Sequence, residues 1–177
     1  MSREFPDWVN PWKAAEGKRI FSGSIPLKRM SRLAPLLDGV QGEASFTASF
    51  ATDGEGRATV SLEVAAKLPL ICQASLRPFR FEVSRRTHLA VIGEEANEED
   101  VPAHYDPAVT RSGKLVFADL VEDELLLAMP QVPRDPELET VAFSTDPDAE
   151  AGGSGEDHYR PFAGLGEMLG GRKQESE

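Results

Sequence analysis

Four carboxylates near residue 120 have the types and spacing best suited to chemistry: Asp119, Glu122, Asp123 and Glu124. Two carboxylates with different pKa values can perform general acid–base catalysis. Acids in the first turns of a helix, however, more often complement the helix dipole and face solvent. A carboxylate-dependent hydrolase is therefore the least favoured of three functional hypotheses for this chain.

Other reactive side chains are few and scattered. Cys72 is the only cysteine and lies in an apolar stretch, while the three histidines, His88, His104 and His158, are far apart in the sequence. No glycine-rich phosphate loop and no strand–turn–helix serine motif occurs. We therefore expect no catalytic residues, no cofactor and no metal site, with Cys72 serving as a small buried hydrophobe.

The charge of −11 is distributed very unevenly along the 177 residues. Residues 1–37 carry +4 and residues 38–93 are neutral, whereas residues 94–160 hold four basic and eighteen acidic side chains, a charge of −14. This balance is opposite to that of a domain that neutralises many phosphates. The acidic half is either a solubilising surface or a landing site for a basic partner such as a ribosomal protein.

Direct RNA binding would need a local basic patch. The candidate residues for such a patch are Lys28, Arg29, Arg32, Arg77, Arg80 and Arg86. The first three fall on one side of an expected short helix, and Arg80 and Arg86 share a face of an expected strand with Glu82. This is the second functional hypothesis.

The elements that position these residues follow from hydrophobic periodicity. Apolar and polar residues alternate over 43–50 and 58–66, and the acidic, glycine-containing turn 52–57 between them predicts an antiparallel hairpin. Residues 70–74 predict a third strand and residues 79–91 a long fourth one. Four sequential strands favour an antiparallel meander with one buried and one solvated face.

Helices are expected on either side of this meander. Residues 19–25 predict a strand that turns at Gly23, and Pro26 then opens a helix that ends or kinks near Ala34, before Pro35. The apolar residues of that helix are Leu27, Met30, Leu33 and Leu37. A brief strand at 115–117 and a helix over 119–128 follow, and Pro130 and Pro133 end that helix.

The sequence thus predicts an α+β fold: an antiparallel meander packed by one or two helices. Residues 1–18 form a flexible N-terminal segment, and residues 19–133 form the domain, which includes an acidic loop at 93–113. Residues 134–177 form an acidic disordered tail. Within the tail, Phe162 and Leu165 belong to an apolar motif at 160–169, which either docks on the domain or folds on a partner.

The N-terminus lacks the apolar core of a signal peptide, and no apolar run is long enough to span a bilayer. We therefore expect a cytoplasmic protein without membrane contact.

Four segments resemble, in order, the bacterial large ribosomal RNA subunit accumulation protein family, also called the YceD family. The most specific is 117–133, with its Val-Glu-Asp-Glu run, leucine-rich helix and Pro-x-x-Pro exit. Residues 21–27 resemble the family's aromatic-x-Gly entry, residues 70–79 its Cys-x-x-Cys followed by Arg-Pro-Phe, and residues 160–169 its Pro-Phe-x-x-Leu element. Ser75 stands where many relatives carry the second cysteine, so Cys72 alone cannot supply two thiolates.

This resemblance implies a non-enzymatic factor for the synthesis, processing or accumulation of large-subunit (23S) ribosomal RNA. The first functional hypothesis is that it binds a basic ribosomal protein or a pre-ribosomal particle, contacts ribosomal RNA either directly or through that partner, and has no small-molecule substrate. The candidate interaction residues are Glu122, Asp123, Glu124, Pro130, Pro133, Phe162 and Leu165.

Overall fold

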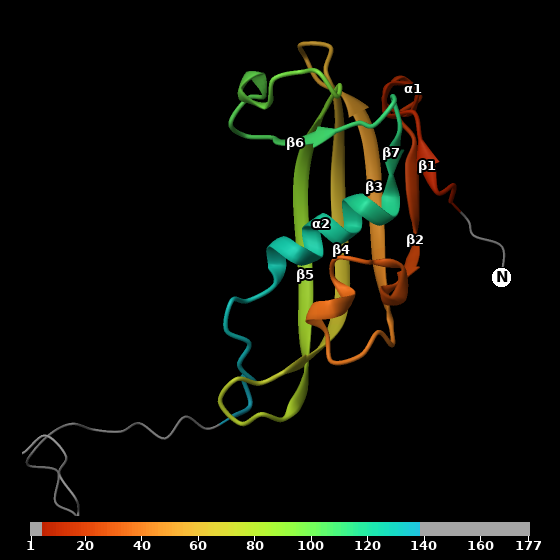
Figure 1. The fold of residues 1–177 in the computed structure, drawn as a ribbon. Coiled ribbons are helices and arrows are strands. Elements are labelled where there is room, and N and C mark those ends of the chain that lie inside the picture. Colours follow the sequence, from red (N-terminus) through yellow and green to blue (C-terminus); the bar gives the residue numbers. More distant parts are fainter. Residues whose placement is uncertain (1–4, 139–177) are drawn as a thin grey trace, which may run out of the picture. The chain divides into compact units, whose positions relative to one another are not determined.

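A curved five-stranded sheet organises the part of the chain that the computed structural model describes, residues 5–138 (Figure 1). Its strands are β2 (Ile20–Pro26), β3 (Glu43–Thr52), β4 (Ala58–Ile71), β5 (Pro78–Ile92) and β6 (Asp106–Val109), in that spatial order. Neighbours from β2 to β5 are antiparallel, and β6 is parallel to β5. The expected antiparallel meander is thus confirmed, with a parallel strand added at one edge.

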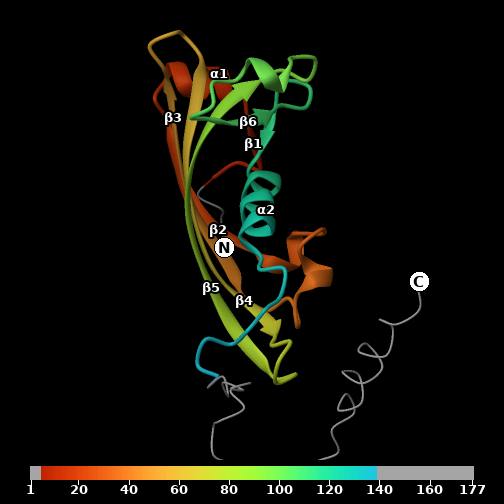
Figure 2. The same cartoon turned by 90° about the vertical axis from the view of Figure 1, so that its left-hand side faces the viewer.

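The alternation in the sequence sets the two faces of this sheet. Ala48 pairs with Leu62, and Leu62 with Thr87, so these three side chains point to the same, buried side. Helix α2 (Phe117–Ala128) lies on this concave side, whereas the convex side carries no element of the described chain (Figure 2). A regular period of two therefore specifies which residues enter the core.

Strand β4 continues through Pro69, where the sequence favours a separate third strand. The pairing with β3 ends at Ala66, while the pairing with β5 continues to Ile71. Pro69 thus lies where one side of β4 has no strand partner, and its carbonyl accepts from the Asp38 amide at 2.8 Å. A proline without an N–H is tolerated at such an edge position. The expected strands at 58–66 and 70–74 are therefore one strand of fourteen residues.

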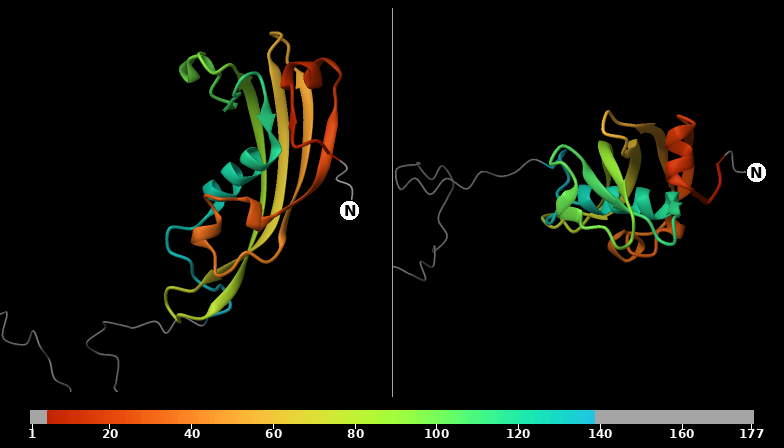
Figure 3. Two further views of the ribbon diagram at one scale, coloured as in Figure 1. Left: turned by 45° about the vertical axis from the view of Figure 1, so that its right-hand side comes forward. Right: turned by 90° about the horizontal axis from the view of Figure 1, so that it is seen from above.

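The N-terminal residues belong to the folded unit, although the sequence favours a flexible segment there. β1 (Trp8–Val9) pairs with β7 (Leu115–Val116), and α1 (Pro11–Glu16) packs near the ends of β3 and β4 (Figure 3). The Asn10 side chain caps α1 by accepting from the Lys13 amide at 3.0 Å. Phe5, Val9, Ala14 and Ala15 are buried in the core.

Five phenylalanines form the centre of the core around Phe117, which is fully buried. Phe117 stacks on Phe46 with ring centroids 5.1 Å apart, and Phe5 meets Phe46 edge-on at 4.9 Å. Phe21 and Phe50 complete the cluster at 5.3 and 6.4 Å from Phe117. This cluster joins β2, β3, α2 and the N-terminal residues.

Gly23 is not the turn that the sequence predicts. It lies in the middle of β2, opposite Phe46, and a Cβ atom built there would be 2.2 Å from the Phe5 ring. The glycine is therefore required because the Phe5 ring occupies the space of a side chain. No backbone turn is involved.

The helix expected after Pro26 is replaced by two short 3-10 turns, η1 (Leu27–Arg29) and η2 (Ala34–Leu36). Leu27, Met30 and Leu33 are fully buried, so the apolar spacing correctly marks the core-facing residues. Met30 itself is extended, at φ −97° and ψ 90°, which interrupts the helix.

The expected acidic loop at 93–113 contains two elements that the sequence does not suggest, η3 (Glu98–Asp100) and β6. β6 has only four residues, including Pro107, so it carries no readable alternation. The helix expected at 119–128 is present as α2 and begins two residues earlier. Among the described residues, no helix has the length and apolar character that a bilayer crossing requires.

Candidate functional site

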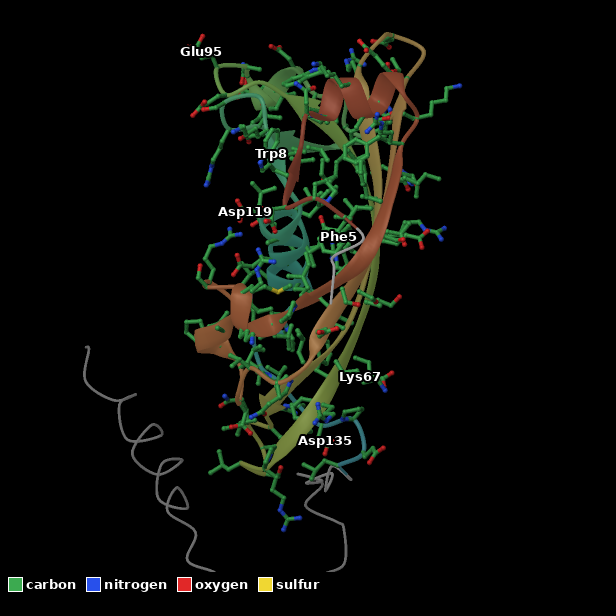
Figure 4. The ribbon with its side chains drawn as sticks, turned by 90° about the vertical axis from the view of Figure 1, so that its right-hand side faces the viewer. Phe5, Trp8, Lys67, Glu95, Asp119 and Asp135 are labelled. Carbon is green, nitrogen blue, oxygen red and sulfur yellow. The ribbon has the colours of Figure 1, made fainter. Side chains whose placement is uncertain are left out.

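Helix α2 carries the acids that the sequence singles out, and the structure separates them by environment. Glu122 and Glu124 are both buried, at 4% exposure, whereas the Asp123 side chain is 54% exposed. Asp119, also exposed, lies near the start of the helix (Figure 4). Residues two apart on a helix point in different directions, so Glu122 and Glu124 do not face each other.

Glu122 binds the segment between the two 3-10 turns. Its Oε1 accepts from the backbone amides of Arg32 at 2.6 Å and Leu33 at 3.0 Å. Its Oε2 accepts from the Arg32 guanidinium at 3.0 and 3.1 Å. The same guanidinium donates to Asp123 at 2.6 Å. Glu122 therefore fastens residues 32 and 33 to α2.

Glu124 binds the sheet instead. Its Oε2 accepts from Arg85 Nε at 2.9 Å and from the Thr87 hydroxyl at 2.7 Å. Arg85 and Thr87 both lie on the α2 side of β5. Within residues 5–138, every fully buried side-chain nitrogen and oxygen has a hydrogen-bond partner.

The hydrogen bonds of Glu122 and Glu124 connect α2 to other elements of the fold. Both buried carboxylates are held by a guanidinium and further donors, and both line one hollow beside α2 together with Asp119 and Asp123. Because each buried carboxylate accepts from its own donors, it stabilises the fold, and a catalytic use of these acids stays a prediction. The described residues also contain no group of three or more His, Cys, Asp or Glu that could hold a metal ion.

The remaining interaction candidates are placed differently. Pro130 and Pro133 are half-buried in the chain that follows α2, and the Pro133 carbonyl accepts from the Gln73 amide at 2.8 Å. Phe162 and Leu165 lie outside the described residues. The role of these candidates in partner binding therefore stays a prediction.

The six candidate RNA-contact residues do not come together in one patch. Arg29 pairs with Asp7 at 3.1 Å, Arg32 with the α2 acids, and Arg86 with Glu63 at 2.6 Å. Lys28, Arg77 and Arg80 are exposed, and within residues 5–138 none of them forms an ion pair. The set divides between the α2 side of the sheet (28–32), the β4–β5 turn (Arg77) and the outer face of β5 (Arg80 and Arg86).

One loop holds the densest group of exposed acids in the folded unit. Glu94, Glu95, Glu98, Glu99 and Asp100 are all exposed, and Glu95 marks the loop at one end of the molecule in Figure 4. Asn97 caps η3 by accepting from the Glu99 amide at 3.2 Å. From here on, the term acidic loop refers to residues 94–100, the most acidic part of the loop expected at 93–113. It presents five carboxylates to solvent, unlike α2.

Cys72 is fully buried in the turn between β4 and β5. Its Sγ accepts from the Asp135 amide at 3.4 Å. The pKa of the thiol is lowered to about 7, chiefly by a hydrogen bond from the Ser75 side chain and then by the Asp135 and Ser75 amides. Ser75 thus contributes a donor at the position where the resembled motif has its second cysteine.

Sequence reasoning overlooks both tryptophans. Trp8 is 48% and Trp12 38% exposed, and they lie on β1 and α1, inside the segment expected to be flexible. The sequence shows two tryptophans within five residues. Elements of two and six residues are too short for a periodic pattern, so the exposure of these side chains could not be predicted.

The structure defines an α+β protein in which a mainly antiparallel sheet carries one helix, held to β5 by the Glu124–Arg85 pair and to the 3-10 segment by the Glu122–Arg32 pair. Residues 60–169 of the chain match a family described as "Large ribosomal RNA subunit accumulation protein YceD". A protein of that name from Haemophilus influenzae is 27% identical over 131 residues, which cover 73% of this chain and 75% of the relative. No solved structure matches the chain. The chain belongs to the YceD family, as its motifs suggest.

Proposed function

We propose that this chain supports the accumulation of large-subunit ribosomal RNA as a non-enzymatic factor that binds a basic ribosomal protein or a pre-ribosomal particle. The family's description and the name of the Haemophilus influenzae relative both refer to accumulation of this RNA. The observation that carries the binding mode is the acidic loop, where five exposed carboxylates meet no cationic side chain among residues 5–138.

The acidic loop suits a cationic partner for electrostatic reasons. Clustered like charges raise the local concentration of an oppositely charged protein and speed its association, and salt screens the effect. Asp123 belongs to the same proposal as an exposed acid. Glu122 and Glu124 contribute by holding α2 in place.

A pull-down of the full chain from lysate tests this proposal, with recovered ribosomal proteins and rRNA as the readout. The test variant is Glu95→Gln, Glu98→Gln, Glu99→Gln and Asp100→Asn, which leaves Glu94 intact because it accepts from the Ser112 amide. We expect it to lose most of the ribosomal components.

The matched control neutralises four other exposed acids, Glu16, Asp38, Glu43 and Glu137, and changes the net charge equally. It should recover those components as the unmodified chain does. Equal recovery by both variants, or a normal ratio of large- to small-subunit rRNA in cells depleted of the protein, would contradict the proposal.

A further inference from the structure

Two exposed tryptophans, Trp8 on β1 and Trp12 on α1, lie near the turn that leads to β7, at the end of the sheet that also carries the acidic loop. They are the only tryptophans of the chain. In β1, Val9 enters the core and Trp8 points outward, and in α1 the buried residues are Pro11, Ala14 and Ala15. The Trp12 ring lies 3.9 Å from the Cβ position of Gly113, in the turn that leads to β7. Figure 4 shows Trp8 beside this region.

Five cations belong to the segments that carry or adjoin these rings: Lys13, Lys18 and Arg19 in and after α1, and Arg111 and Lys114 in the turn before β7. The Lys114 ammonium lies 4.3 Å from the centroid of the Trp8 ring, and Lys13 and Arg19 line a surface hollow together with Trp8. All five side chains are exposed. We call the two tryptophans and these five residues the tryptophan–cation patch.

The cations of this patch are available, unlike most of the other basic residues. In the described part of the chain, ion pairs engage Arg29, Arg32, Arg57, Lys67, Arg85 and Arg86 but none of the five. The acids nearby are Glu16 on α1, Asp7, which pairs with Arg29, and Glu94, which accepts from the Ser112 amide at 3.4 Å. Asp106 and Asp119 also line a hollow together with Arg111 and Lys114. The patch is therefore cationic on a folded unit that has 15 Lys and Arg against 20 Asp and Glu.

Aromatic rings interleaved with unpaired cations suit one class of ligand better than others. Each base of a single strand can stack on an aromatic face, while lysine and arginine neutralise the phosphates between the bases. An acidic peptide would use the cations and leave the rings idle. Double-stranded RNA keeps its bases stacked on each other and offers none to the tryptophans.

We propose that the tryptophan–cation patch binds a short single-stranded segment of RNA by stacking one base on Trp12 and another on Trp8, where the base displaces the Lys114 ammonium and Lys114 pairs with a phosphate instead. The source of that RNA, a large-subunit ribosomal precursor, rests on the proposed function; the binding chemistry does not. Glu94 of the acidic loop accepts from the Ser112 amide, between Arg111 and Lys114 of the patch, so one end of the folded unit presents a cationic and an anionic surface next to each other.

Fluorescence anisotropy of the full chain with a labelled, unstructured oligoribonucleotide tests the proposal. Quenching of tryptophan emission reports the stacking directly. Trp12→Ala should weaken binding by about 5- to 100-fold, the effect of losing one base–aromatic stack. Lys13→Gln with Arg19→Gln should weaken binding at low salt and reduce the slope of log affinity against log salt by about 1 to 1.5.

Two controls keep the result interpretable. Lys67→Gln with Arg80→Gln removes the same charge from the outer face of the sheet and should leave affinity unchanged apart from a small long-range term. Trp12→Phe retains a stacking ring and should recover most of the affinity. Thermal unfolding of each variant verifies that the fold is intact.

The proposal is overturned if the oligoribonucleotide does not bind at about 50 mM salt. It is also overturned if the patch variants bind like the outer-face control, or if a polyglutamate peptide or an RNA duplex quenches the tryptophans equally well. Loss of RNA binding in patch variants that still recover ribosomal proteins would separate this site from the acidic loop. Failure of the acidic-loop test alone would leave the patch standing.

Discussion

At the residue scale, the buried ends of two glutamates explain a motif that the sequence presents as an acidic surface. Glu122 accepts from two backbone amides and Arg32, and Glu124 accepts from Arg85 and Thr87. Of the Glu-Asp-Glu run, only Asp123 reaches solvent. Of three adjacent acids, two are therefore buried acceptors that hold the fold together and one faces solvent. Their partners are 37 to 91 residues away in the sequence.

Gly23 gives the first residue-level prediction. Gly23→Ala should destabilise the fold by about 1–3 kcal/mol, because the new methyl group would overlap the Phe5 ring in a packed core. The measurement is urea unfolding followed by circular dichroism. Gly54→Ala is the control, since nothing lies within 4 Å of a Cβ atom there. An equal midpoint for the two variants would show that Phe5 does not occupy that space.

Cys72 gives a prediction about pH. Its pKa is lowered to about 7 in the folded chain, below the usual 8.5 of a free thiol, so the folded state favours the thiolate. The stabilisation it provides is complete above the pKa of the unfolded chain and is lost as the pH falls through about 7. Ultraviolet absorbance of the thiolate should therefore titrate near neutrality.

Two variants test the cause of that shift. Ser75→Ala should move the titration of Cys72 to higher pH, because the Ser75 hydroxyl is the largest contributor. Cys72→Ala should remove the neutral titration and the matching slope of stability against pH. A thiol that titrates alike in the folded and the urea-unfolded chain would contradict the assignment.

At the element scale, α2 is held by hydrogen bonds to two different parts of the fold. Glu122 connects it to the 3-10 turns and Glu124 connects it to β5, while Phe117 anchors its first turn in the aromatic cluster. Apolar burial and these polar contacts together fix the position of the helix over the sheet.

Removing the contacts of Glu122 should lower the free energy of unfolding. Glu122→Ala leaves the Arg32 and Leu33 amides without their acceptor, and we expect a loss of about 2–3 kcal/mol in the free energy of unfolding. Asp123→Ala changes the same charge on an exposed side chain and should cost less than about 1 kcal/mol. The difference in urea midpoint between the two variants measures how much the buried contacts of Glu122 stabilise the fold. Similar midpoints would contradict this role of Glu122.

The elements also show what sequence patterns can and cannot predict. β3, β5 and α2 were predictable because their apolar residues repeat with a clear period over many positions. β6 was not, since four residues including Pro107 carry no period, and neither were the 3-10 turns, whose path depends on Glu122 far along the chain. The acids of α2 could be found as a motif, but their burial depends on tertiary partners.

At the scale of the whole molecule, the first residues of the chain connect separate parts of the fold. Phe5 touches β2, β3 and α2 through Gly23, Phe46 and Phe117, and β1 pairs with β7. A domain that began at residue 19 would lack these contacts. The boundary between segment and domain was not predictable because residues 5–17 form elements of only two and six residues.

A chain that starts at residue 19 should therefore lose cooperative unfolding. Phe5→Ala in the full chain is the milder variant and should cost about 3–5 kcal/mol, as truncation of a buried phenylalanine does. Differential scanning calorimetry distinguishes the outcomes. A shortened chain with an unchanged, sharp transition would restore the expected boundary at residue 19.

The β4–β5 hairpin has a further consequence at this scale. Its strands of 14 and 15 residues run from the end of the sheet near α1 and β6 to the Cys72 turn (Figure 1), where the Pro133 carbonyl and the Asp135 amide form hydrogen bonds. At about 3.3 Å per residue, the hairpin sets roughly 45 Å between its two poles. Residue 138 lies near the Cys72 turn, at the pole opposite the tryptophans. The hairpin thus separates the two poles, and a ligand small enough to bind at one pole cannot obstruct a partner that binds at the other.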